Sequence, residues 1–190
     1  FRTESDRIAD SSVELIFADP PYDRDSLSFY ADIARIGSRI LKPGGSLIAY
    51  CGQYLLPDIL PIMQAHLRFW WLNACFHSSE HTKARMDSYG IIVNWKPLVW
   101  FVKDDRGDRQ TFVSDVVSGA PEKSHHEWQQ RESDAAYYIE KLTSDHGLVV
   151  DFFAGGGTTC VAAQRLGRPW IAFEINPVTA QRADERIRAL

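Results

Sequence analysis

The clearest indication of the fold is the segment Val149-Val150-Asp151-Phe152-Phe153-Ala154-Gly155-Gly156-Gly157-Thr158-Thr159. Its apolar start predicts a buried strand, its three glycines predict a tight turn, and its threonines stand where a helix begins. Glycine lets the backbone approach a ligand closely, and a helix start offers free N–H groups to a polar or negative group. The stretch therefore predicts a strand–turn–helix unit beside a ligand, although a lone glycine cluster is equally compatible with a turn that binds nothing.

The class of ligand follows from what surrounds the glycines. Glu174 ends the next predicted strand about 20 residues later, where an acid accepts hydrogen bonds from ribose hydroxyls. No lysine follows the glycines, which excludes a phosphate-gripping P-loop. Cys160 stands where a dinucleotide fingerprint has its third glycine. A nucleoside without phosphates fits better, and S-adenosylmethionine is such a ligand.

The rest of the chain alternates between strand and helix patterns without a repeat or a low-complexity linker. We expect a turn at 42–45, strands at 13–18, 46–50, 69–76, 98–103, 148–153 and 170–174, and helices at 28–41, 54–66, 133–143, 159–167 and 177–189. This alternation predicts an α/β fold, a mostly parallel sheet with helices on both faces. We expect residues 1–190 to form a single domain.

A second motif, Asp19-Pro20-Pro21-Tyr22, directly follows the predicted strand 13–18. Ligands of parallel sheets lie outside the carboxyl ends of the strands, so Asp19 and Gly155 are expected at the same edge. The tetrapeptide supplies a carboxylate, a rigid backbone carbonyl and an aromatic face, which together suit a flat ring bearing an exocyclic amine. An Asp that merely caps a turn before two prolines is the structural alternative.

Together these motifs resemble the amino-methyltransferases that modify N6 of adenine or N4 of cytosine in DNA. The resemblance covers residues 8–76, 96–103 and 125–188, and includes the similarity of Phe173-Glu174-Ile175-Asn176-Pro177 to the segment after the family's cofactor loop. Because the catalytic tetrapeptide precedes the cofactor loop, the motif order resembles the circularly permuted beta class of this Rossmann-like methyltransferase fold. His126 and Gln129 match a further family motif, His-x-x-Gln-Lys-Pro, but Gln130 and Arg131 replace its Lys-Pro.

The resemblance implies a role for each motif residue. S-adenosyl-L-methionine is the implied cofactor, and double-stranded DNA with a flipped-out base is the implied partner. Tyr22 would stack on the base, while Asp19 and the Pro20 carbonyl would each accept a hydrogen from the amine. The implied catalytic residues are Asp19, Pro20, Pro21 and Tyr22, and the implied cofactor-binding residues are Asp151, Phe153, Ala154, Gly155, Gly157, Thr158, Glu174 and Asn176.

The sequence leaves open which base is methylated, which nucleic acid is bound and how many subunits assemble. Asp19 favours adenine-N6 methylation, because the cytosine-N4 members of the family more often carry Ser at that position. Methylation of adenine in RNA and a non-catalytic nucleic-acid-binding subunit are the rival functions. Residues 77–95 and 104–124 lack clear periodicity and are candidate target-recognition or lid loops. The family allows a homodimer or an accessory specificity subunit.

The composition argues against a basic nucleic-acid coat, a disulfide-rich protein and a membrane-spanning protein. The chain has 190 residues, 45% of them hydrophobic, and a net charge of −4, which is unlike a basic nucleic-acid coat. Arg68, Lys83, Arg85, Lys96, Arg106 and Arg109 nevertheless form a local basic set that suits DNA phosphates. Three scattered cysteines and isolated histidines predict neither a disulfide framework nor a metal site. No apolar run reaches the ~20 residues that span a bilayer, and the scattered cysteines favour a reducing compartment, so a cytoplasmic protein is expected. The family resemblance implies a bacterial, phage or mobile-element origin.

Overall fold

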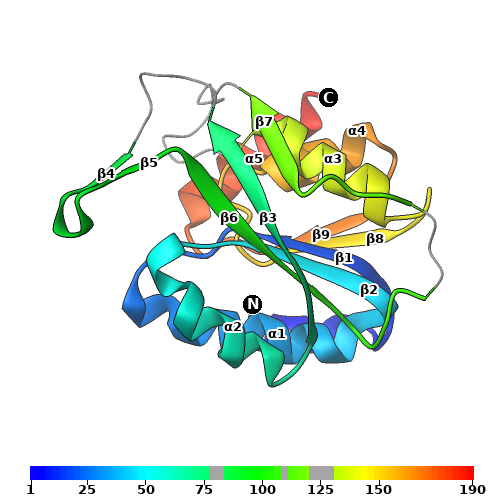
Figure 1. The fold of residues 1–190 in the computed structure, drawn as a ribbon. Helices are drawn as coiled ribbons and strands as arrows, with labels where there is room; N and C mark the ends of the chain where they lie inside the picture. The colour runs from blue at the N-terminus through cyan, green and yellow to red at the C-terminus, as the bar shows by residue number, and fades with distance from the viewer. Residues whose placement is uncertain (78–83, 108–110, 120–130) are drawn as a thin grey trace.

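The computed structural model describes residues 1–77, 84–107, 111–119 and 131–190. Within these residues a seven-stranded sheet runs in the order β7-β3-β6-β2-β1-β8-β9 (Figure 1). Its neighbours pair in parallel except along β6, which is antiparallel to both β2 and β3. The strands are β1 (Val13–Ala18), β2 (Leu41–Tyr50), β3 (Arg68–His77), β6 (Trp95–Val102), β7 (Val116–Gly119), β8 (Leu148–Asp151) and β9 (Trp170–Ala172).

Helices cover both faces of this sheet, as the alternating pattern predicts. One face carries α1 (Leu27–Ile40) and α2 (Leu56–Gln64), and the other carries α3 (Glu132–Leu142), α4 (Thr158–Arg165) and α5 (Pro177–Arg188) (Figure 1). Side chains of β1 point alternately into the two layers, so Ile16 joins the core beneath α1 and Leu15 the core beneath α3. Both are fully buried, and each such side chain contributes about 1.5–3 kcal/mol. The predicted α/β fold, a mostly parallel sheet with helices on both faces, is confirmed.

The expected turn at 42–45 lies within the span of β2 instead of before it. Val13 pairs with Leu41, but the next pair joins Leu15 to Ser46, so the intervening residues of β2 bulge out. Gly44 takes the left-handed backbone conformation there, with a φ of 75°. The glycines correctly predicted a change in chain direction, but β2 pairs with β1 both before and after it.

Two further boundaries differ from expectation. The strands β8 and β9 end at Asp151 and Ala172, two residues earlier than predicted, because the residues that follow form the loops at the ligand edge. The helix expected at 54–66 begins as a 3-10 turn, η3 (Gln53–Leu55), before α2. Short 3-10 turns also occur at η1 (Glu4–Arg7) and η2 (Arg24–Ser26).

The stretches expected to be irregular contain short strands. Within 77–95, β4 (Ala84–Met86) and β5 (Ile91–Val93) form an antiparallel hairpin joined by η5 (Asp87–Tyr89), and β6 already starts at Trp95. The edge strand β7 lies within 104–124. Three- and four-residue strands are too short to show an alternating pattern, which is why periodicity missed them. Residues 78–83, 108–110 and 120–124 of these two stretches lie outside the described residues.

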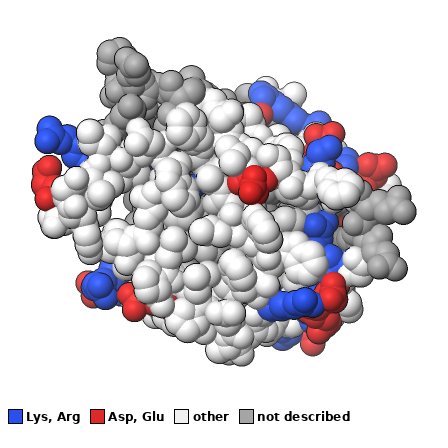
Figure 2. All heavy atoms as spheres, in the orientation of Figure 1, with Lys and Arg blue, Asp and Glu red and all other residues white. Residues whose placement is uncertain are grey.

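Most charged side chains lie toward the rim of the face that Figure 2 shows, and one acidic group lies near its middle. On β3, Trp71, Leu72 and Phe76 are exposed. None of the described helices is long and apolar enough to cross a lipid bilayer.

A buried ion pair fixes the start of α3 against the sheet. The Arg131 guanidinium donates through Nε to Asp134 Oδ2 at 3.0 Å, and its Nη2 lies 2.8 Å from Oδ1. The hydroxyl of Tyr50, at the end of β2, donates to Asp134 Oδ2 at 3.1 Å. Cys75 Sγ lies 3.2 Å from the same oxygen, so the pair links α3 to β2 and β3. Both charged side chains are at most 4% exposed, so neither exchanges its partner for water.

We predict that Asp134→Ala lowers the free energy of unfolding by about 3–5 kcal/mol, because it leaves the Arg131 charge buried without its partner. Asp184→Ala is the matched control, since Asp184 pairs with Arg188 on α5 with both side chains largely exposed. Its loss should stay below about 1 kcal/mol. Urea denaturation followed by circular dichroism measures both, and equal losses in the two variants would contradict a structural role for the buried pair.

Candidate functional site

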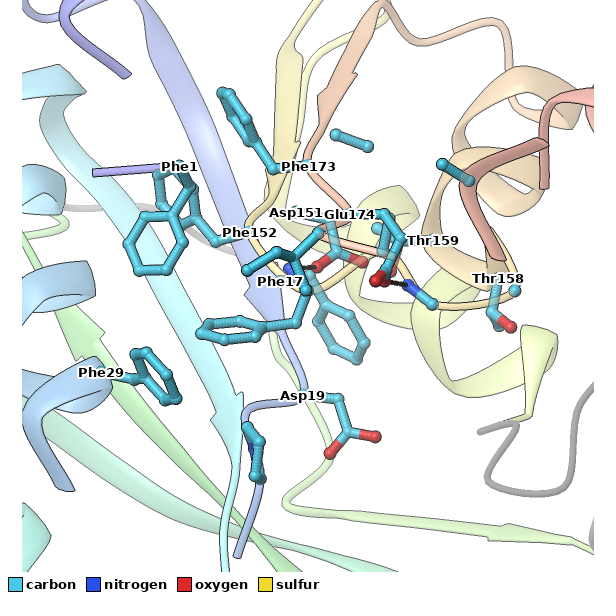
Figure 3. Close-up of a pocket in the computed structure, with 18 of the residues that line it drawn as sticks. Phe1, Phe17, Asp19, Phe29, Asp151, Phe152, Thr158, Thr159, Phe173 and Glu174 are labelled. Atoms are coloured by element: carbon cyan, nitrogen blue, oxygen red, sulfur yellow. Dashed lines mark hydrogen bonds between the residues drawn. The ribbon is translucent and has the colours of Figure 1, made fainter. Parts of the chain in front are cut away.

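A cavity of about 710 Å³ opens where β1, β8 and β9 end (Figure 3). Its volume lies in the range of small-molecule sites, 300–1,000 Å³. Among the described residues that line it, none is Lys or Arg. The predicted site residues that line it are Asp19, Pro21, Asp151, Phe153, Ala154, Gly155, Thr158 and Glu174. The two motifs, more than 130 residues apart in sequence, therefore share one cavity.

The glycine turn and the loop after β9 are tied together by Glu174. Its Oε2 accepts the Gly155 N–H at 2.8 Å, and its Oε1 accepts the Asn176 N–H at 2.8 Å. Gly155 has a φ of 48°, a backbone conformation that favours glycine. In this conformation its N–H points at the Glu174 carboxylate. A carboxylate has about four acceptor positions, so Glu174 retains capacity for hydroxyl groups of a ligand.

Two predicted cofactor residues, Gly157 and Asn176, do not line the cavity. Gly157 has a φ of 77°, and a Cβ there would lie 3.1 Å from Ala183 Cβ, so glycine permits the close approach of α5. The Asn176 side chain accepts the Val178 and Thr179 N–H groups at 3.0 and 3.2 Å, which makes it the N-terminal cap of α5. Packing explains the glycine at position 157, and helix capping explains the asparagine at position 176. Direct contact of either residue with a ligand stays a prediction.

Asp151, the last residue of β8, is a buried carboxyl with a shifted pKa. Burial raises its pKa to about 7, reinforced by the nearby Asp19 and Glu174 charges and opposed by hydrogen bonds with Thr159 and the Phe153 N–H. The Phe153 bond, at 2.9 Å to Oδ1, orients the carboxyl. A cationic ligand beside Asp151 would favour its ionised form, because opposite charges lower a carboxyl pKa.

An aromatic wall forms another side of the cavity. The rings of Phe29 and Phe1 contact the Phe153 ring, with centroids 5.4 and 5.3 Å away. Phe152 stacks on Phe173 at 5.5 Å. Figure 3 shows Phe1 and Phe29 across the cavity from Thr158 and Thr159. Phe1 and Phe29 were missed in the sequence, since a helical spacing assigns Phe29 to the core and an isolated Phe1 gives no signal.

The tetrapeptide lies at the end of β1, with its members directed to different surroundings. Asp19 lines the cavity, and the Tyr22 hydroxyl donates a hydrogen bond to Asp19 Oδ1. Burial, followed by the Asp19 charge, raises the pKa of Tyr22 well above its usual value, so this hydroxyl keeps its proton. Lys96 Nζ lies 5.4 Å from the centre of the Tyr22 ring, and Pro20 is buried.

A second cavity of about 470 Å³ adjoins the tetrapeptide through Tyr22. The β4–β5 hairpin contributes Met86, Tyr89, Ile91 and Val93 to its lining, and the start of β6 contributes Trp95, Lys96 and Pro97. Asp19 and Pro21 line the first cavity and Tyr22 lines the second, so the tetrapeptide stands between them. The tetrapeptide therefore contributes a carboxylate to one cavity and an aromatic ring to the other.

Comparisons with known proteins agree with this geometry. A family model described as DNA methylase, the N6/N4 methylase family, matches residues 120–185. The type II methyltransferase M2.LlaDCHI of Lactococcus lactis subsp. cremoris is 21% identical over 89% of this chain and 80% of its own length. The type II methyltransferase M.PvuII of Proteus hauseri is 46% identical, but only over 41 residues, 22% of this chain and 12% of that protein.

The part of the chain that matches the DNA methylase model, residues 120–185, includes Asp151, the glycine turn and Glu174.

Solved structures share the fold. The cytosine-N4-specific PvuII DNA methyltransferase superposes with a TM-score of 0.81 at 18% identity, over 96% of this chain and 82% of its own. A putative DNA modification methylase from Thermus thermophilus, complexed with S-adenosyl-L-methionine, gives 0.80 at 20% identity, over 99% and 90% of the two chains. At these identities the likeness shows the architecture alone, and the chemistry has to be argued from the residues.

Arg131, where this chain departs from the methylase family's Lys-Pro, is explained by the structure. Its side chain is 4% exposed and belongs to the ion pair with Asp134, so the departure provides a buried anchor for α3. The other members of that motif, His126, Gln129 and Gln130, lie outside the described residues.

The predicted basic set is only partly available to DNA. Arg106 is 8% exposed and lies 4.7 Å from the centre of the Trp100 ring, so its guanidinium packs inside the fold and the phosphate role is wrong for this residue. Arg68 pairs with Asp105 at 2.5 Å. Lys96 faces Tyr22, and Lys83 and Arg109 lie outside the described residues. Among the residues that the structure describes, no group of three or more His, Cys, Asp or Glu side chains could hold a metal ion.

We predict that Asp151→Asn changes the pH dependence of stability. A carboxyl whose pKa is higher in the folded state stabilises the fold at low pH, and this contribution is lost as the pH rises toward about 7. The free energy of unfolding of the variant, relative to the original protein, should therefore rise by about 2.5 kcal/mol between pH 5 and pH 8. Urea denaturation at both pH values measures it, with Glu140→Gln on the exposed side of α3 as control. A pH-independent difference would contradict the shifted pKa.

Proposed function

We propose that this chain transfers a methyl group from S-adenosyl-L-methionine to N6 of adenine in DNA, with residues 1–190 forming the catalytic domain. The observation that carries the proposal is the position of Asp19: its carboxylate lines the cavity of the glycine turn, while its neighbour Tyr22 lines the second cavity. The methyl group of the donor has to reach the amine of the acceptor base, and the tetrapeptide contributes residues to the linings of both cavities.

The first cavity fits S-adenosyl-L-methionine. Glu174 would hold the ribose hydroxyls, and the aromatic wall, especially Phe153, would pack against the adenine ring. Asp151 would lie near the methionine portion, whose positively charged groups would favour the ionised form of its carboxyl. The lining residues lack Lys and Arg, as expected for a nucleoside ligand that carries no phosphate. When bound, the cofactor supplies an electrophilic methyl group on a sulfonium.

The second cavity supports a flipped-out base. Taking a base out of the duplex costs a few kcal/mol, which stacking on Tyr22 would offset in part. Asp19 and the Pro20 carbonyl would each accept one hydrogen from the exocyclic amine. A carboxylate can accept several hydrogen bonds, so Asp19 can serve the amine while it accepts from Tyr22. Two fixed acceptors orient the amine lone pair, and catalysis by this chain would come from positioning and electrostatics.

Adenine is proposed over cytosine because Asp, and not Ser, occupies position 19. Methylation of cytosine N4 is the second candidate, favoured by the similarity to the cytosine-N4-specific PvuII enzyme. Both bases present an exocyclic amine, so the same pair of acceptors could bind either one. An RNA substrate and a non-catalytic subunit of the same fold are further outcomes that the experiments below distinguish.

The identity of the product tests the proposal directly. The protein is incubated with isotopically labelled S-adenosyl-L-methionine and either unmethylated genomic DNA or total RNA, and the digested nucleosides are separated by mass spectrometry. We expect labelled N6-methyladenine from DNA. Labelled N4-methylcytosine would overturn the choice of base, label found only in RNA nucleosides would overturn the choice of nucleic acid, and cofactor binding without any labelled product would favour a non-catalytic subunit.

We predict that Asp19→Ala abolishes methyl transfer, by at least about a hundredfold, because the amine loses its charged acceptor. Cofactor affinity should stay within about threefold of the original protein, since the glycine turn, Asp151 and Glu174 are intact. Isothermal titration with S-adenosyl-L-methionine and a radiolabel transfer assay measure the two quantities separately. Retained turnover would refute the assignment of Asp19, and lost binding would show that the residue serves the cofactor instead.

A further inference from the structure

A chain of contacts leads from the β4–β5 hairpin to Asp19 through two tyrosines outside the predicted motifs. The ring of Tyr89, at the turn of the hairpin, packs against the ring of Tyr54 with centroids 6.0 Å apart. The Tyr54 hydroxyl donates a hydrogen bond to the backbone carbonyl of Tyr22. The Tyr22 hydroxyl in turn donates to Asp19 Oδ1. Three consecutive contacts thus join an exposed hairpin to the catalytic carboxylate.

The local sequence is built to hold Tyr54 in this place. Tyr54 belongs to the 3-10 turn η3, whose last residue, Leu55, is fully buried and fixes the turn to the core beneath α1. A Cβ at Gly52 would lie 3.0 Å from Tyr54 Cε1 and 3.6 Å from Tyr22 Cβ. A side chain at position 52 would therefore push Tyr54 away from Tyr22, and glycine leaves the space that the hydrogen bond requires.

Tyr22 is held at both of its ends by this arrangement. Pro20 and Pro21 fix their own φ angles and provide no N–H donors, so the backbone ahead of Tyr22 has little freedom. Behind it, the carbonyl of Tyr22 is the group that Tyr54 holds. The ring direction of Tyr22 determines both the stacking face in the second cavity and the hydrogen bond to Asp19.

We propose that Tyr54 is a positioning residue that couples the placement of the β4–β5 hairpin to Tyr22 and Asp19. This proposal rests on the proposed methyl transfer, which gives Tyr22 and Asp19 their roles. The hairpin carries Tyr89, Ile91 and Ile92 as exposed side chains, so it is open to contact by a bound nucleic acid. Movement of the hairpin on binding would reach the tetrapeptide through Tyr54.

The test compares Tyr54→Phe, which keeps the ring contact with Tyr89 and removes only the hydroxyl, with the original protein. We expect kcat for DNA methylation to fall about tenfold, the factor for one lost hydrogen bond, while KM for DNA and the affinity for S-adenosyl-L-methionine stay within twofold. Tyr137→Phe is the matched control, because the Tyr137 hydroxyl also bonds the backbone, at Ser114 N, but on the α3 side of the sheet. Unchanged kcat, or an equal loss in the control, would overturn the proposal.

A double-mutant cycle tests the coupling itself. Tyr89→Ala should lower kcat severalfold in the original protein and have no further effect on the Tyr54→Phe background, since the link is already broken. Additive effects would show that the hairpin acts on turnover without Tyr54, which contradicts the proposal.

Hydrogen exchange of the peptide that covers residues 22–30 provides a readout without turnover. Exchange should be faster in Tyr54→Phe and in Tyr89→Ala than in Tyr137→Phe. If the original protein methylates neither DNA nor RNA, the proposed function fails, and exchange alone then decides the coupling. Equal exchange in all three variants would overturn the coupling whether or not the enzyme is active.

Discussion

The parallel pairing of β1 with β8 brings the two motifs of this chain together. Ile16 lies opposite Val150, and three residues beyond Ile16 the tetrapeptide begins. Parallel neighbours end at the same edge of a sheet, so Asp19 and Asp151 meet although 131 intervening residues separate them in sequence. The fully buried side chains of both strands keep this register, because a slip of one residue would turn each of them to the opposite face.

That pairing also concentrates negative charge. Asp19, Asp151 and Glu174 all line one cavity, and the charges of Asp19 and Glu174 help to raise the pKa of Asp151. Backbone N–H groups compensate in part, two for Glu174 and one for Asp151. A cavity with acidic walls and no described Lys or Arg lining favours cationic ligands over phosphorylated ones. The electrostatics of the edge therefore agree with a sulfonium cofactor and disagree with a dinucleotide.

The sequence predicted what depends on local pattern and missed what depends on packing. The strand β1 matched its expected range, since a continuous apolar run ending at Asp19 is a strong signal. The hairpin β4–β5 and the strand β7 were missed because pairing, and not propensity, makes such short segments extended.

Within the site, the motifs placed Asp19, Gly155 and Glu174 at one edge in advance. Phe29 illustrates the limit: a helical spacing shows that its side chain faces inward, but not that the cavity lies there. The contact of Tyr54 with Tyr22 was equally invisible, because it joins residues 32 apart through a side chain and a backbone carbonyl. Hydrophobic periodicity predicts single helices and strands, but it does not predict the contacts between them.

Two buried aspartates show how the same residue type serves structure in one place and chemistry in another. Asp134 and Asp151 are both at most 5% exposed. Asp134 has a guanidinium as partner, so its charge is compensated within the protein itself. Among the described residues, Asp151 is hydrogen-bonded to the neutral Thr159 and Phe153 and lies near the Asp19 and Glu174 charges, and burial raises its pKa to about 7. A buried acid that lacks a cation in its own chain costs stability unless a ligand supplies one. The acidic surroundings of Asp151 therefore suit the positively charged part of the proposed cofactor.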